Sequence, residues 1–218
     1  MRRILFFLLI TEMISMSTFA QKPGNILEQI LLSNPDKFKK LTDNPKKYRL
    51  QILYTQIDRD ANNKPTLTTY SYRSDSNEYF YPASTVKLAA SVLALEKLNT
   101  LKIDKSTTFQ TLKNRPSQLE IKTDSTTKSG LPSVEHYIKK ILLVSDNEAY
   151  NRLYEFLGQQ PLNETMRSKG INGVRLTHRL QTPLPRLENQ YTNPINLMDQ
   201  SGKVIYQQAE TFNNKPYS

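Results

Sequence analysis

The segment from Ala83 to Leu98 constrains the fold more than any other part of this 218-residue chain. Pro82 precedes it, and proline is favoured in the first turn of a helix, so we predict that a helix begins here. Apolar side chains cover nearly its whole circumference, which is typical of a helix in a protein core. Lys87 lies near its start, where burying an ammonium group is costly unless the group is neutralised or paired.

Ser84 precedes this lysine by three residues, so both side chains fall on one face of the predicted helix. Burial lowers the proton affinity of a lysine and makes it a usable base. The helix dipole also favours negative charge in the first turn. The pair therefore indicates a serine nucleophile activated by Lys87. The alternative is structural: Ser84 caps the helix and Lys87 extends to solvent.

A second polar motif, Ser145-Asp146-Asn147, falls where one predicted helix ends and the next begins. A hydroxyl and an amide at such a junction can line a cleft and contact a bound substrate. The alternative is a helix capping box formed by Ser145 and Glu148.

Together the two motifs resemble two of the three motifs of class A β-lactamases and penicillin-binding proteins. Ser145 follows Ser84 by 61 residues, a separation similar to the class A pattern. The resemblance extends from about residue 25 to 170 and weakens after residue 180. It implies an exported serine hydrolase whose substrate is a β-lactam or a peptidoglycan peptide, with no cofactor.

The resemblance also implies a role for each motif residue. Ser84 would attack the substrate carbonyl, and its backbone N–H would form half of an oxyanion hole. Lys87 would take or relay the proton of Ser84, and Ser145 would pass a proton to the leaving nitrogen. Asn147 would hydrogen-bond the side-chain amide of the substrate, while Asp146 would hold the loop in place.

Two departures from the family pattern open a second interpretation. The third motif, Lys-Thr-Gly, would fall beyond Ser218, so we expect the C-terminal strands to be missing. The family's deacylating Glu would fall near Gln181, where there is none; Glu188 is the nearest candidate, but Thr192 stands where an Asn is expected. Without that base an acyl-enzyme would persist. The alternative is a catalytically impaired relative that binds peptidoglycan or a partner protein.

The remaining pattern predicts an α+β fold, α/β sandwich-like, in which a helical region packs on an antiparallel sheet. We expect one domain, residues 21–218, with a hairpin formed by strands at 48–57 and 66–72. Further helices are predicted at residues 25–32, 133–145, 147–157 and 162–168. Residues 100–130 read as polar connection, and the chain beyond residue 180 as loop with one possible strand at 204–206.

The first twenty residues have the pattern of a secretory signal. Arg2 and Arg3 precede an apolar run, residues 4–10, and small residues follow up to Ala20. The run is too short to span a bilayer. We therefore predict cleavage after Ala20 and a secreted or periplasmic protein with no membrane span; the alternative is a buried N-terminal helix.

Composition narrows the possible partners. The chain has no cysteine and two histidines, which excludes disulfides and a cysteine-linked lipid anchor and leaves no metal-ligand spacing. The net charge of +10 would favour polyanions, but ordinary solvated lysines are the preferred explanation of it. For an exported protein, envelope polymers fit better than nucleic acid. No oligomeric state is predicted.

Overall fold

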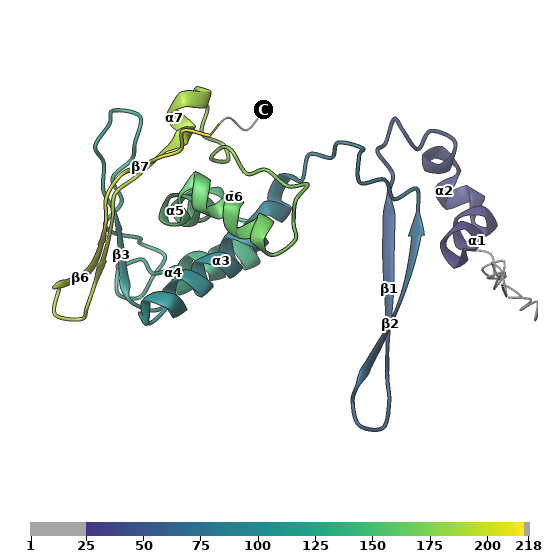
Figure 1. The fold of residues 1–218 in the computed structure, drawn as a ribbon, viewed down its shortest axis with the longest axis horizontal. Coiled ribbons are helices and arrows are strands. Elements are labelled where there is room, and N and C mark those ends of the chain that lie inside the picture. The colour runs from purple at the N-terminus through teal and green to yellow at the C-terminus, as the bar shows by residue number, and fades with distance from the viewer. Residues whose placement is uncertain (1–24, 216–218) are drawn as a thin grey trace, which may run out of the picture. The chain divides into compact units, whose positions relative to one another are not determined.

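The computed structural model describes residues 25–215, and the chain divides after Phe80 into two compact units (Figure 1). The predicted signal sequence, residues 1–20, lies outside the described residues. No helix within residues 25–215 has the length and apolar character needed to cross a membrane.

The first unit consists of two short helices and a hairpin. Helix α1 (Ile26–Ser33) begins where the side chain of Asn25 accepts a hydrogen bond from the backbone of Leu27, and α2 (Pro35–Thr42) has proline in its first turn. Strands β1 (Ile52–Arg59) and β2 (Pro65–Tyr72) then pair antiparallel, which confirms the predicted hairpin.

The second unit is built around helix α3 (Val86–Leu101), which follows a single 3-10 turn, η1 (Ala83–Thr85). Helices α4 (Val134–Val144), α5 (Asn147–Leu157) and α6 (Gln159–Ser168) pack against it. The predicted helices at these positions are confirmed. The core residues include Ala90, Leu93, Ala94, Leu98, Tyr137, Ile141, Leu153, Tyr154, Phe156 and Leu162.

Helix α3 differs from the prediction in one respect. Its apolar residues were expected to be buried all round, but Leu88, Val92 and Leu95 are exposed. Within the second unit, α4, α5 and α6 cover only the side of α3 that carries Ala90 and Leu93. The apolar sequence therefore predicted the helix correctly and its burial only in part.

A three-stranded antiparallel sheet lies along one side of these helices, in the order β3-β5-β6 (Figure 1). Its strands are β3 (Thr108–Thr111), β5 (Ile195–Met198) and β6 (Val204–Gln208). Phe109 of β3 makes edge-to-face contacts with Tyr137 of α4 and Phe156 of α5, at ring-centre distances of 5.4 and 5.5 Å. The sheet thus packs on the helical region, and the predicted α+β class is confirmed.

The prediction of loop for the connections was wrong. Residues 100–130 contain strand β3. The chain beyond residue 180 contains β5, a short helix α7 (Arg186–Gln190) and the strand pair β4 (Tyr191–Thr192) and β7 (Thr211–Phe212). These elements have two to five residues, too few for a hydrophobic period to show. Long-range pairing stabilises them instead: Phe109 is opposite Leu197, and Leu197 is opposite Tyr206.

Lys97 of α3 joins the helices to this sheet. Its Nζ donates to the carbonyl oxygen of Phe156 at 2.5 Å and to Oε1 of Gln208 at 2.6 Å, and lies 4.2 Å from the centre of the Phe156 ring. Burial lowers the pKa of Lys97 to about 8. The ammonium group therefore carries a desolvation cost that its neutral form does not.

Replacing Lys97 with methionine should remove a pH-dependent part of the stability. The folded pKa of about 8 lies below the ordinary value of 10.5, so the unfolded chain holds the proton more tightly and wild-type stability rises between these two pH values. A full shift of this size corresponds to roughly 3 kcal/mol. Urea unfolding measures the free energy of unfolding of wild type and of Lys97→Met below pH 8 and near pH 10.5. The stability of wild type relative to that of the variant should be greater at the higher pH.

The matched control is Lys169→Met, which removes an exposed ion pair with Glu96. This variant should keep the pH dependence of wild type. Parallel stability profiles for wild type and Lys97→Met would contradict the prediction.

Candidate active site

The start of α3 presents Ser84 to solvent. Ala83, just before it, adopts a left-handed backbone conformation with φ of 46°, which costs a residue with a side chain energy. Pro82 holds the turn, since its carbonyl oxygen accepts hydrogen bonds from the backbone N–H and the hydroxyl of Thr85. The tight turn leaves the Ser84 side chain exposed at the helix start.

Lys87 is buried, with 2% of its surface exposed, and its ammonium nitrogen has three oxygen contacts. Nζ lies 3.2 Å from Oγ of Ser84, 3.0 Å from Oγ of Ser145 and 2.5 Å from the backbone oxygen of Ser145. Lys87 thus joins the two sequence motifs, 58 residues from Ser145 along the chain. The alternative in which Lys87 extends to solvent does not match this geometry.

Burial lowers the pKa of Lys87, and the nearby charge of Asp146 partly opposes this effect. A lysine with a lowered pKa has a larger neutral fraction near neutral pH, and only the neutral amine can accept a proton.

The backbone at the junction of α4 and α5 places Ser145 against the lysine. Ser145 ends α4 in a left-handed conformation with φ of 55°, and its N–H donates to the carbonyl oxygen of Ile141. Asp146 caps α5, because its Oδ1 accepts a hydrogen bond from the N–H of Ala149 at 2.8 Å. The capping-box alternative for Ser145 is therefore wrong. Asn147 is the first residue of α5 and is half-buried.

Gln181, in the loop before α7, and Glu188, in α7, are the positions at which a deacylating carboxylate was sought, and their surroundings differ. Gln181 is exposed, in a left-handed conformation with φ of 53°. It lines a pocket with Tyr81, which is three residues before Ser84 and stacks on the ring of His178. The carboxylate of Glu188 instead accepts a hydrogen bond from the hydroxyl of Ser117 at 2.5 Å. The carboxylate of Glu188 is thus engaged by a residue that is 71 positions away in the sequence.

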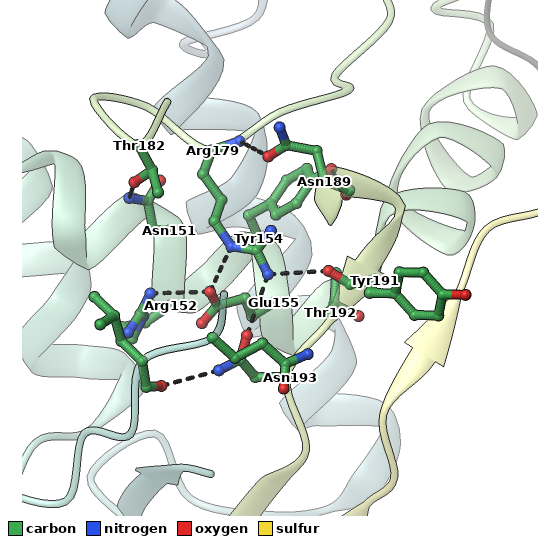
Figure 2. Close-up of polar contacts among 12 residues, drawn as sticks. Asn151, Arg152, Tyr154, Glu155, Arg179, Thr182, Asn189, Tyr191, Thr192 and Asn193 are labelled. Carbon is green, nitrogen blue, oxygen red and sulfur yellow. Dashed lines mark hydrogen bonds and ion pairs between the residues drawn. The ribbon is translucent and has the colours of Figure 1, made fainter. Parts of the chain in front are cut away.

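A buried ionic cluster fixes this loop to α5 (Figure 2). Oε1 of Glu155 accepts from Nε of Arg179 at 2.7 Å and from Nη2 of Arg152 at 2.9 Å. Arg179 also donates to the backbone oxygen of Tyr191 and to Oδ1 of Asn193, at 3.0 and 3.1 Å. A single carboxylate therefore holds two guanidinium groups, and one of these groups, that of Arg179, holds β4 and the residue after it.

Asn151, one turn after Asn147, makes a second attachment. Its side chain accepts from the N–H of Leu180 at 2.8 Å and donates to the carbonyl oxygen of the same residue at 3.0 Å. It also donates to the hydroxyl of Thr182 at 3.2 Å (Figure 2). Neither the ionic cluster nor this attachment was predicted from the sequence. The available signal was the series of polar residues among the buried aromatic and aliphatic positions of α5, namely Asn151, Arg152 and Glu155.

Within residues 25–215, no group of three or more His, Asp or Glu side chains is placed to hold a metal ion. The groups that meet at the junction are two hydroxyls and a desolvated amine. Such a set can move a proton and form a covalent bond to an electrophile.

Comparison with known proteins gives one family. The sequence model of the Beta-lactamase enzyme family matches residues 36–210. The chain is also similar to the crystal structure of a β-lactamase from Burkholderia vietnamiensis, with 18% sequence identity and a TM-score of 0.40. That match covers 66% of this chain and 51% of the other, so the matched part is about half the length of that structure. No curated protein matches the sequence.

Proposed function

Because this chain belongs to the beta-lactamase enzyme family, we propose that it is a serine hydrolase that forms an acyl-enzyme at Ser84 with β-lactams or D-alanyl peptides. One observation carries the proposal: the buried Nζ of Lys87 lies 3.2 Å from Oγ of Ser84. A desolvated amine at hydrogen-bond distance from a hydroxyl is the arrangement that makes a serine nucleophilic.

In the acylation step, neutral Lys87 accepts the proton of Ser84 as Oγ bonds to the carbonyl carbon of the substrate amide. The negative charge that develops on the carbonyl oxygen is stabilised by the backbone N–H of Ser84. Collapse of this intermediate breaks the carbon–nitrogen bond. The proton then passes from Lys87 to Ser145, whose Oγ is 3.0 Å from Nζ, and on to the leaving nitrogen. Asn147 binds the side-chain amide of the substrate.

Deacylation is the slow step in this proposal. It needs a base to activate water, and the loop offers the amide of Gln181 rather than a carboxylate. Glu188 is hydrogen-bonded to Ser117. The acyl-enzyme therefore persists, and the protein binds penicillins rather than destroying them. The same observation supports the second candidate, a catalytically impaired relative that holds peptidoglycan or a partner protein.

We propose a secreted or periplasmic location, because of the signal-like residues 1–20, and a β-lactam or peptidoglycan peptide rather than nucleic acid as the ligand. Peptidoglycan is part of the bacterial cell envelope, so an exported protein would meet it there.

Ser84→Ala should abolish covalent labelling by a fluorescent penicillin, because the variant has no oxygen to acylate. Wild type should take up one label per chain, found by mass spectrometry on the peptide that contains Ser84, and lose it slowly after excess reagent is removed. Ser91→Ala is the matched control, since Ser91 is buried in the same helix and its hydroxyl donates only to the carbonyl oxygen of Lys87. This control should label like wild type.

The two candidates give different results. A label that survives Ser84→Ala would contradict the nucleophile assignment. A folded wild-type protein that takes no label would favour the impaired relative.

A further inference from the structure

Lys140, near the end of α4, lies between two carboxylates from different parts of the chain. Its Nζ is 3.1 Å from Oδ2 of Asp124, in the loop before α4, and 3.4 Å from Oδ2 of Asp146, at the start of α5. The lysine side chain is 22% exposed, and both carboxylates are less than a quarter exposed. Such partly buried ion pairs are less screened by solvent and salt than surface pairs.

Asp146 has two effects on the active site that oppose each other. Its Oδ1 caps α5 and so holds the junction where Ser145 contacts Lys87. Its negative charge, however, favours the protonated form of Lys87 and raises the pKa that burial lowers. An amine must be neutral to accept a proton, so the cap that positions Ser145 also reduces the neutral fraction of Lys87.

We propose that Lys140 is a positioning residue for acylation, which holds Asp146 in its capping geometry and offsets its charge so that Lys87 can be neutral. The inference rests on the proposed function, in which Lys87 is the base. Lys140 uses Oδ2 of Asp146 and leaves Oδ1 for the N–H of Ala149, so the ion pair and the helix cap form together.

Lys140 and Asp124 both carry their charge near neutral pH. Burial alone would lower the pKa of Lys140, but the hydrogen bond to Asp124 and the charge of Asp146 outweigh it and raise the pKa. Burial opposes ionisation of Asp124 in the same way, yet hydrogen bonds from Thr126 and Lys140 lower its pKa to about 2. Lys140 therefore stays positive and Asp124 negative over the range in which an amine base titrates.

The other charged groups around this set come from α4 and α5. His136 of α4 places Nε2 3.4 Å from Oδ2 of Asp124. Burial raises the pKa of Tyr137, the neighbouring residue of α4, and the charges of Arg152 and Glu155 of α5 act on the same hydroxyl. Among the described residues near Lys87, Asp146 is the charged group that acts on the lysine directly.

The test is the pH dependence of the labelling rate with a fluorescent penicillin. Lys140→Met leaves Asp146 without its counter-charge, so Lys87 should keep its proton to higher pH. We expect the rising limb of the profile to move up by about one pH unit, which makes labelling about tenfold slower on that limb and leaves the high-pH plateau unchanged. Lys140→Arg, which keeps the charge, should restore the wild-type profile.

Lys139→Met is the matched control, with the same change of net charge one residue away on the same helix. Lys139 is 63% exposed and pairs with Glu135 at 3.1 Å, away from Asp146. Its profile should superimpose on that of wild type. If the profiles of folded Lys140→Met and Lys139→Met coincide, the inference is overturned.

A second measurement separates this inference from the proposed function. The 13C resonance of the Lys87 ε-carbon, assigned by its loss in Lys87→Met, reports the protonation of the amine without any substrate. Lys140→Met should shift this titration to higher pH even if wild type takes no penicillin label, an outcome that would refute the proposed function alone. An unshifted titration overturns the role of Lys140 whether or not the protein is acylated.

Discussion

Replacing Lys87 with methionine should slow labelling by a fluorescent penicillin by about 10²- to 10⁴-fold, the usual contribution of a general base. The variant should be as stable as wild type or more stable. Methionine has a similar volume, and burial disfavours the charged form of Lys87, so removing the amine also removes a desolvation cost. The labelling rate gives the effect on acylation, and thermal unfolding of the same preparation gives the effect on stability. Loss of acylation without loss of stability is the signature of a residue retained for chemistry.

Lys87→Arg is the control for charge. Arginine keeps a positive group at this position but stays protonated at accessible pH, so it should not rescue the rate. In wild type, the rate should rise with pH as Lys87 loses its proton, and the lowered pKa places this rise below the ordinary range of lysine. A Lys87→Met protein that labels as fast as wild type would show that the amine has only a structural role.

Replacing Glu155 with glutamine should destabilise the second unit by about 3 to 5 kcal/mol, the cost of removing one partner from a buried ion pair. Glu155 is 1% exposed and is the shared acceptor of Arg152 and Arg179, so its loss leaves two buried guanidinium groups without the carboxylate that joins them. Urea unfolding gives the change in free energy. Hydrogen exchange should also rise in the segment that Arg179 holds, around Tyr191 and Asn193.

Glu148→Gln is the matched control, because Glu148 is on the same helix but is 55% exposed and 3.8 Å from Arg152. This variant should change the free energy of unfolding by less than about 0.5 kcal/mol, as surface substitutions usually do. Equal effects of the two substitutions would mean that the buried cluster contributes no more than a surface pair.

The variants at Lys87 and at Glu155 separate the residues that take part in acylation from those that stabilise the fold around them. Lys87 lies where α3 begins, beside the junction of α4 and α5, and is expected to affect rate without affecting stability. Glu155 lies further along α5 and holds the loop that contains Gln181 through Arg179. Its replacement should affect stability first and the rate only through the position of that loop.

Local pattern alone determined the long elements and the two motifs. Helices α3, α4 and α5 have enough residues for an apolar period or a cap to be visible, and the hairpin of β1 and β2 alternates clearly. Ser84, in the turn η1, and Lys87, in the first turn of α3, are three residues apart in a continuous helical segment, so their proximity follows from local geometry. The sequence therefore predicted both the α+β class and the pair at the start of α3.

Tertiary structure decided what depends on distant partners. The contact between Lys87 and Ser145 exists because α3 packs beside the junction of α4 and α5, and no local preference contains that information. The strands around Phe109 and Leu197 are too short to form alone and gain their stability from pairing and burial. The interior ion cluster of Glu155 likewise needs Arg179, 24 residues away in sequence, to be brought inside. In the sequence, Glu155 and Arg179 are indistinguishable from charged surface residues. They stabilise the fold only because folding buries them together, away from water.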